Sequence, residues 1–171
     1  LSAESAIGEY PVAAVTAMQR TLLAADTFQD EHELDEHQTL HETRIIPLKE
    51  TTTTAALTSA ARKVMELQPI AAVAVFTVTG TTARLLAKQR PPCPIVALSS
   101  YPPTLRRCCL YRGVMPHSAK TPNDTLEAVE LASKTCTEIG VAKPGDRIIV
   151  LSGHPFDNPG TTNGMVVQTI K

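Results

Sequence analysis

The chain has 171 residues, of which 43% are hydrophobic and 4% aromatic, and a formal net charge of -1. This length suits one domain with a leading extension, and a core built from aliphatic side chains. The near-neutral charge argues against nucleic acid or a membrane surface as a partner recruited by charge. The sequence contains no apolar run long enough to span a bilayer and no signal-peptide pattern at its start.

The chain has four cysteines, and none of them is spaced like a zinc-binding pair: Cys93, Cys108, Cys109 and Cys136. The adjacent Cys108 and Cys109 are hard to join to each other without strain. We therefore interpret the cysteines as reduced thiols, most of them buried, which favours a cytoplasmic location.

The first residues read as the end of a strand running into a turn, and a domain seldom begins there. We expect the chain to be cut from something longer. A helix is then predicted from Pro11 to about Ala25. Its apolar residues recur at helical spacing: Val12, Val15, Met18 and Leu22.

An acidic stretch follows at residues 29–44 and predicts a solvated hinge or a connecting helix. Glu33, His37 and His41 are spaced by four residues, so a helix would place them on one face. They are a candidate metal site. The alternative is an exposed polar face, which is favoured because nothing apolar nearby would enclose a metal ion.

From residue 51 onward, helical patterns alternate with short apolar runs. We expect helices at 51–68, 81–89, 103–111 and 121–139, and strands at 70–77, 95–98, 113–116, 147–152 and 163–170. In the last two helices we expect these residues to face the core: Leu105 with Cys109 or Leu110, then Leu126, Val129, Ala132, Cys136 and Ile139.

This alternation predicts an α/β fold, a three-layer, mostly parallel, doubly wound sheet of about five strands. The connection to the last strand contains no helix. The last strand should therefore return antiparallel, at an edge of the sheet.

The strand at 70–77 leads through a glycine turn into a helix, the usual place for a phosphate in an α/β protein. Residues there combine a flexible backbone with hydroxyl donors: Thr77, Thr79, Gly80, Thr81 and Thr82. The alternative is that these threonines only cap the helix. The loop at 153–162 also leaves the carboxyl end of a strand, so both loops should open on one edge of the sheet.

Several segments together resemble pyruvate kinase, and its C-terminal regulatory domain in particular. The matching segments are LSAESA (1–6), GEYP (8–11), GTTAR (80–84), RP (90–91), PI (94–95), LYRGV (110–114), GD (145–146) and PGTTN (159–163). Their order and spacing hold over nearly the whole chain, except at residues 26–46.

The resemblance implies three parts: the last helix of the catalytic barrel at 1–28, an acidic connecting segment at 29–46 and the C-terminal α/β domain at 47–171. It implies an enzyme that transfers a phosphoryl group from phosphoenolpyruvate to ADP with Mg²⁺ and K⁺. The catalytic lysine and the metal ligands of the family precede the segment that matches Leu1. We therefore assign no catalytic residue and no cofactor to this chain, and expect it alone to be inactive.

The resemblance also makes residues 77–82 an effector loop that holds a phosphate. Thr81 stands where the family usually has arginine, and no arginine lies near residues 125–128 to meet a second phosphate. These losses favour a monophosphate effector. The candidate phosphate-binding residues are Thr77, Thr79, Gly80, Thr81, Thr82, His154, Gly160 and Thr161, with His154 as a cation at mildly acidic pH.

The last strand carries apolar residues at Met165, Val167 and Ile170 and is expected to form an exposed edge. Members of the family are tetramers that meet partly through this domain. We therefore expect a homo-oligomer that also contacts its own barrel domain. Two other functions remain open, a free-standing phosphate-ligand binding module and an oligomerisation domain whose effector site has decayed.

Overall fold

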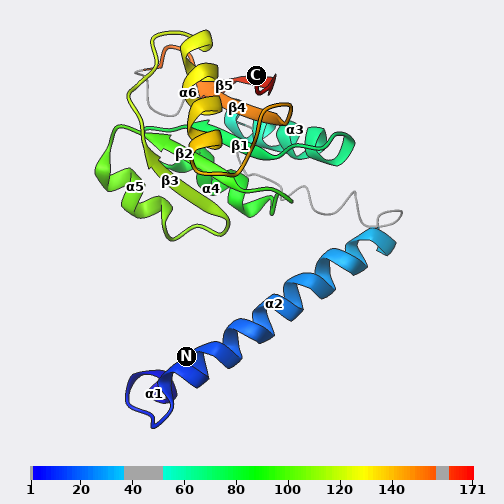
Figure 1. Ribbon diagram of the computed structural model, residues 1–171, viewed down its shortest axis with the longest axis vertical. Helices are drawn as coiled ribbons and strands as arrows, with labels where there is room; N and C mark the ends of the chain where they lie inside the picture. Colours follow the sequence, from blue (N-terminus) through cyan, green and yellow to red (C-terminus); the bar gives the residue numbers. More distant parts are fainter. Residues whose placement is uncertain (1, 37–51, 157–161) are drawn as a thin grey trace. The chain divides into compact units, whose positions relative to one another are not determined.

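Figure 1 shows the computed structural model of the protein, which describes residues 2–36, 52–156 and 162–171. The side chains of residues 29–36 are not among those described. The chain divides into two compact units, Leu1–Leu48 and Lys49–Lys171. Each unit is considered by itself.

The first unit consists of a short helix α1 (Ala3–Ala6) and a long helix α2 (Pro11–Glu36). The prediction that the second helix fades near Ala25 is wrong, because α2 continues for 26 residues. After Pro11 it contains neither glycine nor proline, so nothing in its backbone forces an end. Its described side chains, through Phe28, are exposed or half-buried.

The second unit alternates helices and strands as the sequence predicts. Its elements are α3 (Thr53–Leu67), β1 (Ala72–Phe76), α4 (Thr81–Lys88), β2 (Ile95–Ser99), α5 (Pro102–Cys108), β3 (Val114–Ser118), α6 (Thr125–Glu138), β4 (Arg147–Gly153) and β5 (Thr162–Thr169). The sheet has five strands in the order β3-β2-β1-β4-β5. The first four are parallel, and β5 pairs antiparallel with β4. The predicted fold class is confirmed, including the antiparallel edge strand.

The central strand β1 is buried on both faces, and its alternating side chains enter two separate cores. Ala72, Ala74 and Phe76 pack on the face covered by α6. Val73 and Val75 pack on the opposite face, beneath α3, α4 and α5. The unit therefore has three layers: α6 on one face, the sheet in the middle, and α3, α4 and α5 on the other face (Figure 1).

Two predicted helix faces are wrong in part. In α5 the buried residues are Thr104 and Cys108, whereas Leu110 lies beyond the helix and is 84% exposed. In α6 the predicted Ala132 and Cys136 are buried together with Ala128, and the predicted Val129 and Ile139 pack against the same core. Leu126 alone departs from the prediction and is 76% exposed. The fully buried positions of α6 carry small side chains at four-residue spacing, and larger apolar residues such as Val129 and Ile139 pack beside them.

The start of α6 also differs from the prediction. The helix begins at Thr125 and not near Pro122. Asp124 is its N-cap residue, and the Asp124 carboxylate accepts a hydrogen bond of 2.8 Å from the backbone amide of Glu127. The side chain of Asp124 thus satisfies one of the backbone amides that the first turn leaves without an intrahelical partner.

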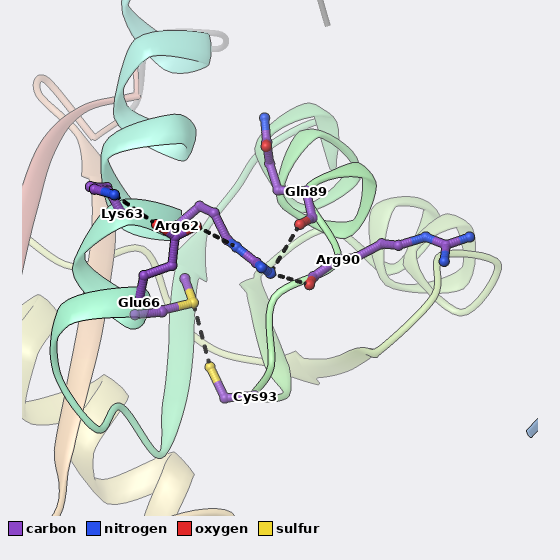
Figure 2. A network of polar contacts seen from close by, with 7 residues as sticks. Arg62, Lys63, Glu66, Gln89, Arg90 and Cys93 are labelled. Carbon is purple, nitrogen blue, oxygen red and sulfur yellow. Dashed lines mark hydrogen bonds and ion pairs between the residues drawn. The ribbon is translucent and has the colours of Figure 1, made fainter. Parts of the chain in front are cut away.

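A polar network fastens α3 to the end of α4 (Figure 2). Arg62 of α3 donates from Nη1 to the backbone carbonyls of Gln89, at 3.3 Å, and Arg90. These carbonyls belong to the C-terminal end of α4, where intrahelical donors run out. Glu66 holds the same guanidinium from the other side, with its Oε1 3.3 Å from Nε.

Among the described helices, none combines the length and apolar character that crossing a membrane requires.

Candidate functional site

A cavity of about 160 Å³ opens at the carboxyl ends of the parallel strands of the second unit. The loops after β1, β2, β3 and β4 all contribute to it. Because β2 and β4 lie on opposite sides of β1, this edge is the topological switch point, where α/β sheets bind ligands.

The loop between β1 and α4 lines one wall of the cavity with hydroxyls. The hydroxyl of Thr77 accepts a 2.9 Å hydrogen bond from the amide of Gly80, which closes a tight turn. Gly80 has φ +84° and is the N-cap residue of α4, with no side-chain cap. The hydroxyls of Thr79 and Thr81 lie 3.0 Å apart on the exposed side of the turn.

Side chains of helix α5 donate hydrogen bonds to the backbone of this turn. Thr104 donates a hydrogen bond of 2.6 Å to the carbonyl of Val78, and Arg107 donates one of 2.9 Å to the carbonyl of Thr79. The sulfur of Cys108 lies 3.3 Å from the position that a Cβ on Gly80 would take. Burial raises the pKa of the Cys108 thiol, so this sulfur packs as an uncharged group.

Buried threonines join the turn to β5 and to α3. The hydroxyls of Thr82 and Thr162 are hydrogen-bonded at 2.7 Å. Thr54 donates to the carbonyl of Thr162 at 3.5 Å. The hydroxyl of Thr52 caps α3, accepting from the amide of Ala55 at 3.3 Å. The first turns of α3 and α4 therefore both reach the cavity, and their dipoles favour an anion there.

The opposite rim comes from the loops after β2 and β3. It includes Ser99, Ser100, Tyr101, Lys120 and Thr121. Within the described part of the chain, Lys120 is the one cationic residue that lines this cavity.

Lys120 forms an ion pair with Glu127 in the first turn of α6. Glu127 also accepts hydrogen bonds of 2.7 Å each from the backbone amide and the side-chain amide of Asn123. The bond from Lys120, and then those from Asn123, lower the pKa of Glu127 to about 2. Glu127 is therefore fully ionised at neutral pH.

The predicted site residues fall into three groups: the threonine turn, the residues outside the described part of the chain, and His154. Thr77, Thr79, Thr81 and Thr82 line the cavity, and Gly80 begins α4 beside them. Gly160 and Thr161 lie outside the described residues.

His154 is not one of the residues that line the cavity, but its ring contacts Phe156, which does line it. Its Nε2 lies 2.8 Å from the hydroxyl of Thr125, and its ring meets Phe156 edge-on, with centroids 4.3 Å apart. Gly153, Phe156 and Thr162 line the cavity together with the threonine turn. The two predicted loops therefore open on the same edge of the sheet.

The rim residues from the other two loops were not predicted from the sequence. Ser99 and Ser100 directly follow the buried residues of β2, and Ala119 and Lys120 follow β3. Applying the rule about carboxyl ends to every parallel strand, and not only to the two loops rich in glycine and threonine, would have found them.

The predicted metal site at Glu33, His37 and His41 lies outside the residues whose side chains are described. Among the side chains that are described, no group of three histidine, cysteine, aspartate or glutamate residues is placed to hold a metal ion.

Comparison with known proteins identifies the family. Residues 55–168 match the family model described as the pyruvate kinase alpha/beta domain. Pyruvate kinases of Lactobacillus delbrueckii subsp. bulgaricus and Geobacillus stearothermophilus are 35% and 34% identical over 170 residues, covering 99% of this chain and 28% of each relative. Pyruvate kinase 1 of Candida glabrata is 36% identical over 175 residues, covering 99% of this chain and 34% of the relative.

The chain therefore spans between 28% and 34% of the length of these three relatives. The resemblance found in the sequence is confirmed at both levels, by the domain model and by relatives matched along almost the whole chain. The chain belongs to the pyruvate kinase family, and residues 55–168 carry its α/β domain.

Proposed function

We propose that the second unit is the effector-binding domain of a pyruvate kinase and that its cavity holds the phosphate group of a small activator. The whole enzyme would transfer a phosphoryl group from phosphoenolpyruvate to ADP. The observation that carries the proposal is the convergence of the threonine turn with the first turns of α3 and α4 in one cavity. Hydroxyl donors and helix N-termini are what an oxyanion requires.

The charge of the cavity favours a monophosphate. Lys120 is the one cation among its described lining residues, and Glu127 already neutralises it in part. Arg107 directs Nη1 to the carbonyl of Thr79, as a support of the turn. A bisphosphate would bring a second dianion into a cavity with no second lining cation among those residues, which favours a ligand with a single phosphate.

Catalysis belongs, in this proposal, to a barrel domain outside the present chain, together with its Mg²⁺ and K⁺. Helix α2 supports the link to such a domain, since it exposes large apolar side chains: Val12, Leu22, Leu23 and Phe28. Buried against a barrel, these side chains would no longer contact water.

Self-association is the second part of the proposal. Strand β5 is an edge of the sheet, with Val167 40% exposed. Ile170 lies just beyond the strand and packs into the core, so it does not contribute to the exposed edge. An edge strand with free backbone groups supports pairing with a second copy. The four cysteines are free, which fits a protein that works in the reducing cytoplasm.

Ligand-dependent melting tests the effector site. The full chain is heated with glucose 6-phosphate, AMP or fructose 1,6-bisphosphate, with glucose as the uncharged control. A monophosphate present at about 100 times its Kd stabilises the folded state by roughly 2.7 kcal/mol and raises Tm. The double variant T79V/T81V removes an exposed hydroxyl pair and should lose this shift, whereas T137V, an exposed threonine of α6, should keep it.

Absence of any shift at millimolar phosphate ligand would reject the effector site and leave an oligomerisation domain. Turnover separates the remaining alternative. The chain alone should form no pyruvate from phosphoenolpyruvate and ADP, and adding the preceding barrel segment of the same protein should restore an activity that the ligand changes. If the protein has no preceding barrel segment, a ligand-dependent rise in Tm would indicate a free-standing phosphate-binding module.

A further inference from the structure

The ion pair between Lys120 and Glu127 holds the one lysine among the described lining residues of the cavity on a carboxylate that does not itself line it. Lys120 lines the cavity, and its side chain is 66% exposed, so it has freedom to move. Glu127 is 21% exposed and is fixed by its two hydrogen bonds from Asn123. The lysine is the mobile partner of the pair, and the glutamate is the fixed one.

Holding Lys120 on Glu127 has a cost for any anion that enters the cavity. The ligand must either leave the lysine where it is, and face the negative charge of Glu127, or draw the ammonium group away. Exposed ion pairs are weak, whereas hydrogen bonds from an ammonium group to a phosphate are strong. Exchange of partners is therefore energetically accessible.

We propose that Glu127 is an internal competitor of the phosphate ligand: it holds Lys120 in the free protein and releases it to the phosphate on binding. The inference rests on the proposed function and adds a means of setting its affinity. Glu127 lowers the affinity for anions in general, and only a ligand whose phosphate reaches Lys120 recovers the loss. Lys120 is then a determinant of specificity that the threonine turn alone does not supply.

Glu127→Gln is a suitable probe because a glutamine oxygen still accepts the two bonds from Asn123. The matched controls are on the same helix. Lys134 and Glu138 form an ion pair with Nζ and Oε1 3.8 Å apart, and neither lines the cavity. E138Q therefore changes net charge by the same amount as E127Q, and K134M matches K120M.

Titration calorimetry of the full chain with glucose 6-phosphate measures the effect. We expect E127Q to bind roughly two- to fivefold more tightly than wild type, about 0.4–1 kcal/mol, the range of an exposed ion pair. K120M should bind more weakly, K120R should restore binding, and E138Q and K134M should match wild type. In the K120M background, E127Q should gain less than it does alone, because the two residues are coupled.

Each result decides the matter. Equal affinity of wild type and E127Q, with binding intact, overturns the competitor and leaves the effector site standing. An equal gain in E138Q reduces the effect to net charge and also overturns it. Binding by E127Q where wild type shows none supports the competitor in its strongest form. Binding by neither protein rejects the effector site and the competitor together.

Discussion

Gly80 connects the cavity to the core beneath it. Its backbone has φ +84°, a conformation that costs an L-residue about 1–2 kcal/mol. A Cβ there would lie 3.3 Å from the sulfur of Cys108 and 3.6 Å from a methyl carbon of Thr104. The turn that presents the threonine hydroxyls is thus shaped by the absence of a side chain.

Gly80→Ala and Gly113→Ala separate backbone strain from loss of the site. Gly113 also has a positive φ, +68°, but a Cβ there would meet nothing within 4 Å. Both variants should lose about 1–2 kcal/mol of unfolding free energy in urea. Only G80A should also lose the ligand-dependent rise in Tm, because it displaces the turn.

Equal ligand responses in the two alanine variants would show that the shape of the turn is not needed for binding. If G113A also lost the ligand-dependent rise in Tm, the cause would be a general loss of folded structure. A much lower unfolding free energy of G113A would reveal such a loss.

At the residue scale, the sequence predicted the hydroxyl wall of the cavity and missed its cation. Thr77, Thr79, Thr81 and Thr82 are local to one turn, so a short motif contains them all. Lys120 follows the carboxyl end of β3, which lies two positions from β1 in the sheet. It reaches the cavity because the strand order brings the ends of these strands to one edge. A motif search cannot find a residue that the strand order brings in.

At the scale of elements, α3 is held at its N-terminal turn and in its C-terminal half. Its N-terminal turn meets the cavity through Thr52 and Thr54, and Arg62 binds the carbonyls at the end of α4. Helices α3 and α4 are thus clamped side by side, with the first turn of each at the site. None of the residues labelled in Figure 2 lines the cavity.

Arg62→Met tests this clamp. It removes the donor to two backbone carbonyls while retaining much of the side-chain volume, and should cost about 1–2 kcal/mol because hydrogen bonds from charged groups are strong and this one is partly exposed. Lys63→Met is the control, since its ion pair with Glu66 at 3.0 Å involves a lysine that is 64% exposed. It should change stability by less than about 0.5 kcal/mol.

Chemical unfolding of the two variants provides the measurement. Equal midpoints for R62M and K63M would mean that the carbonyls at the end of α4 are satisfied as well by water, and that the clamp does not stabilise the layer.

The sequence predicted β1, β2 and β4 well because each contains a run of four or more apolar residues bounded by proline, glycine or polar residues. It predicted the faces of α5 and α6 less well. Periodicity favours large apolar residues such as Leu110 and Leu126, whereas the sheet accepts the small Ala128 and Cys108. The close approach of helix to sheet is decided by the opposing layer, which a single segment does not contain.

At the scale of the whole molecule, the two units differ in what they can do alone. The second unit has two cores of its own, one on each face of the sheet. The described side chains of α2 have no buried member. Independent stability therefore belongs to the second unit.

A shortened chain of residues 49–171 checks this division. We expect it to unfold cooperatively, with the Tm of the full chain and the same response to glucose 6-phosphate. The helical circular dichroism should fall by the share contributed by α1 and α2. A broad transition at lower temperature would show that the first unit stabilises the second.

The hydrogen bond between the hydroxyls of Thr82 and Thr162 joins residues 80 positions apart in the chain. The threonine turn, all four described helices of the second unit and four of its five strands precede Thr162 in the chain. Contacts so distant in sequence form late, since the entropy of closing the intervening loop must be overcome first. The cavity is therefore among the last features that the second unit acquires, and a ligand bound there would report that folding of this unit is complete.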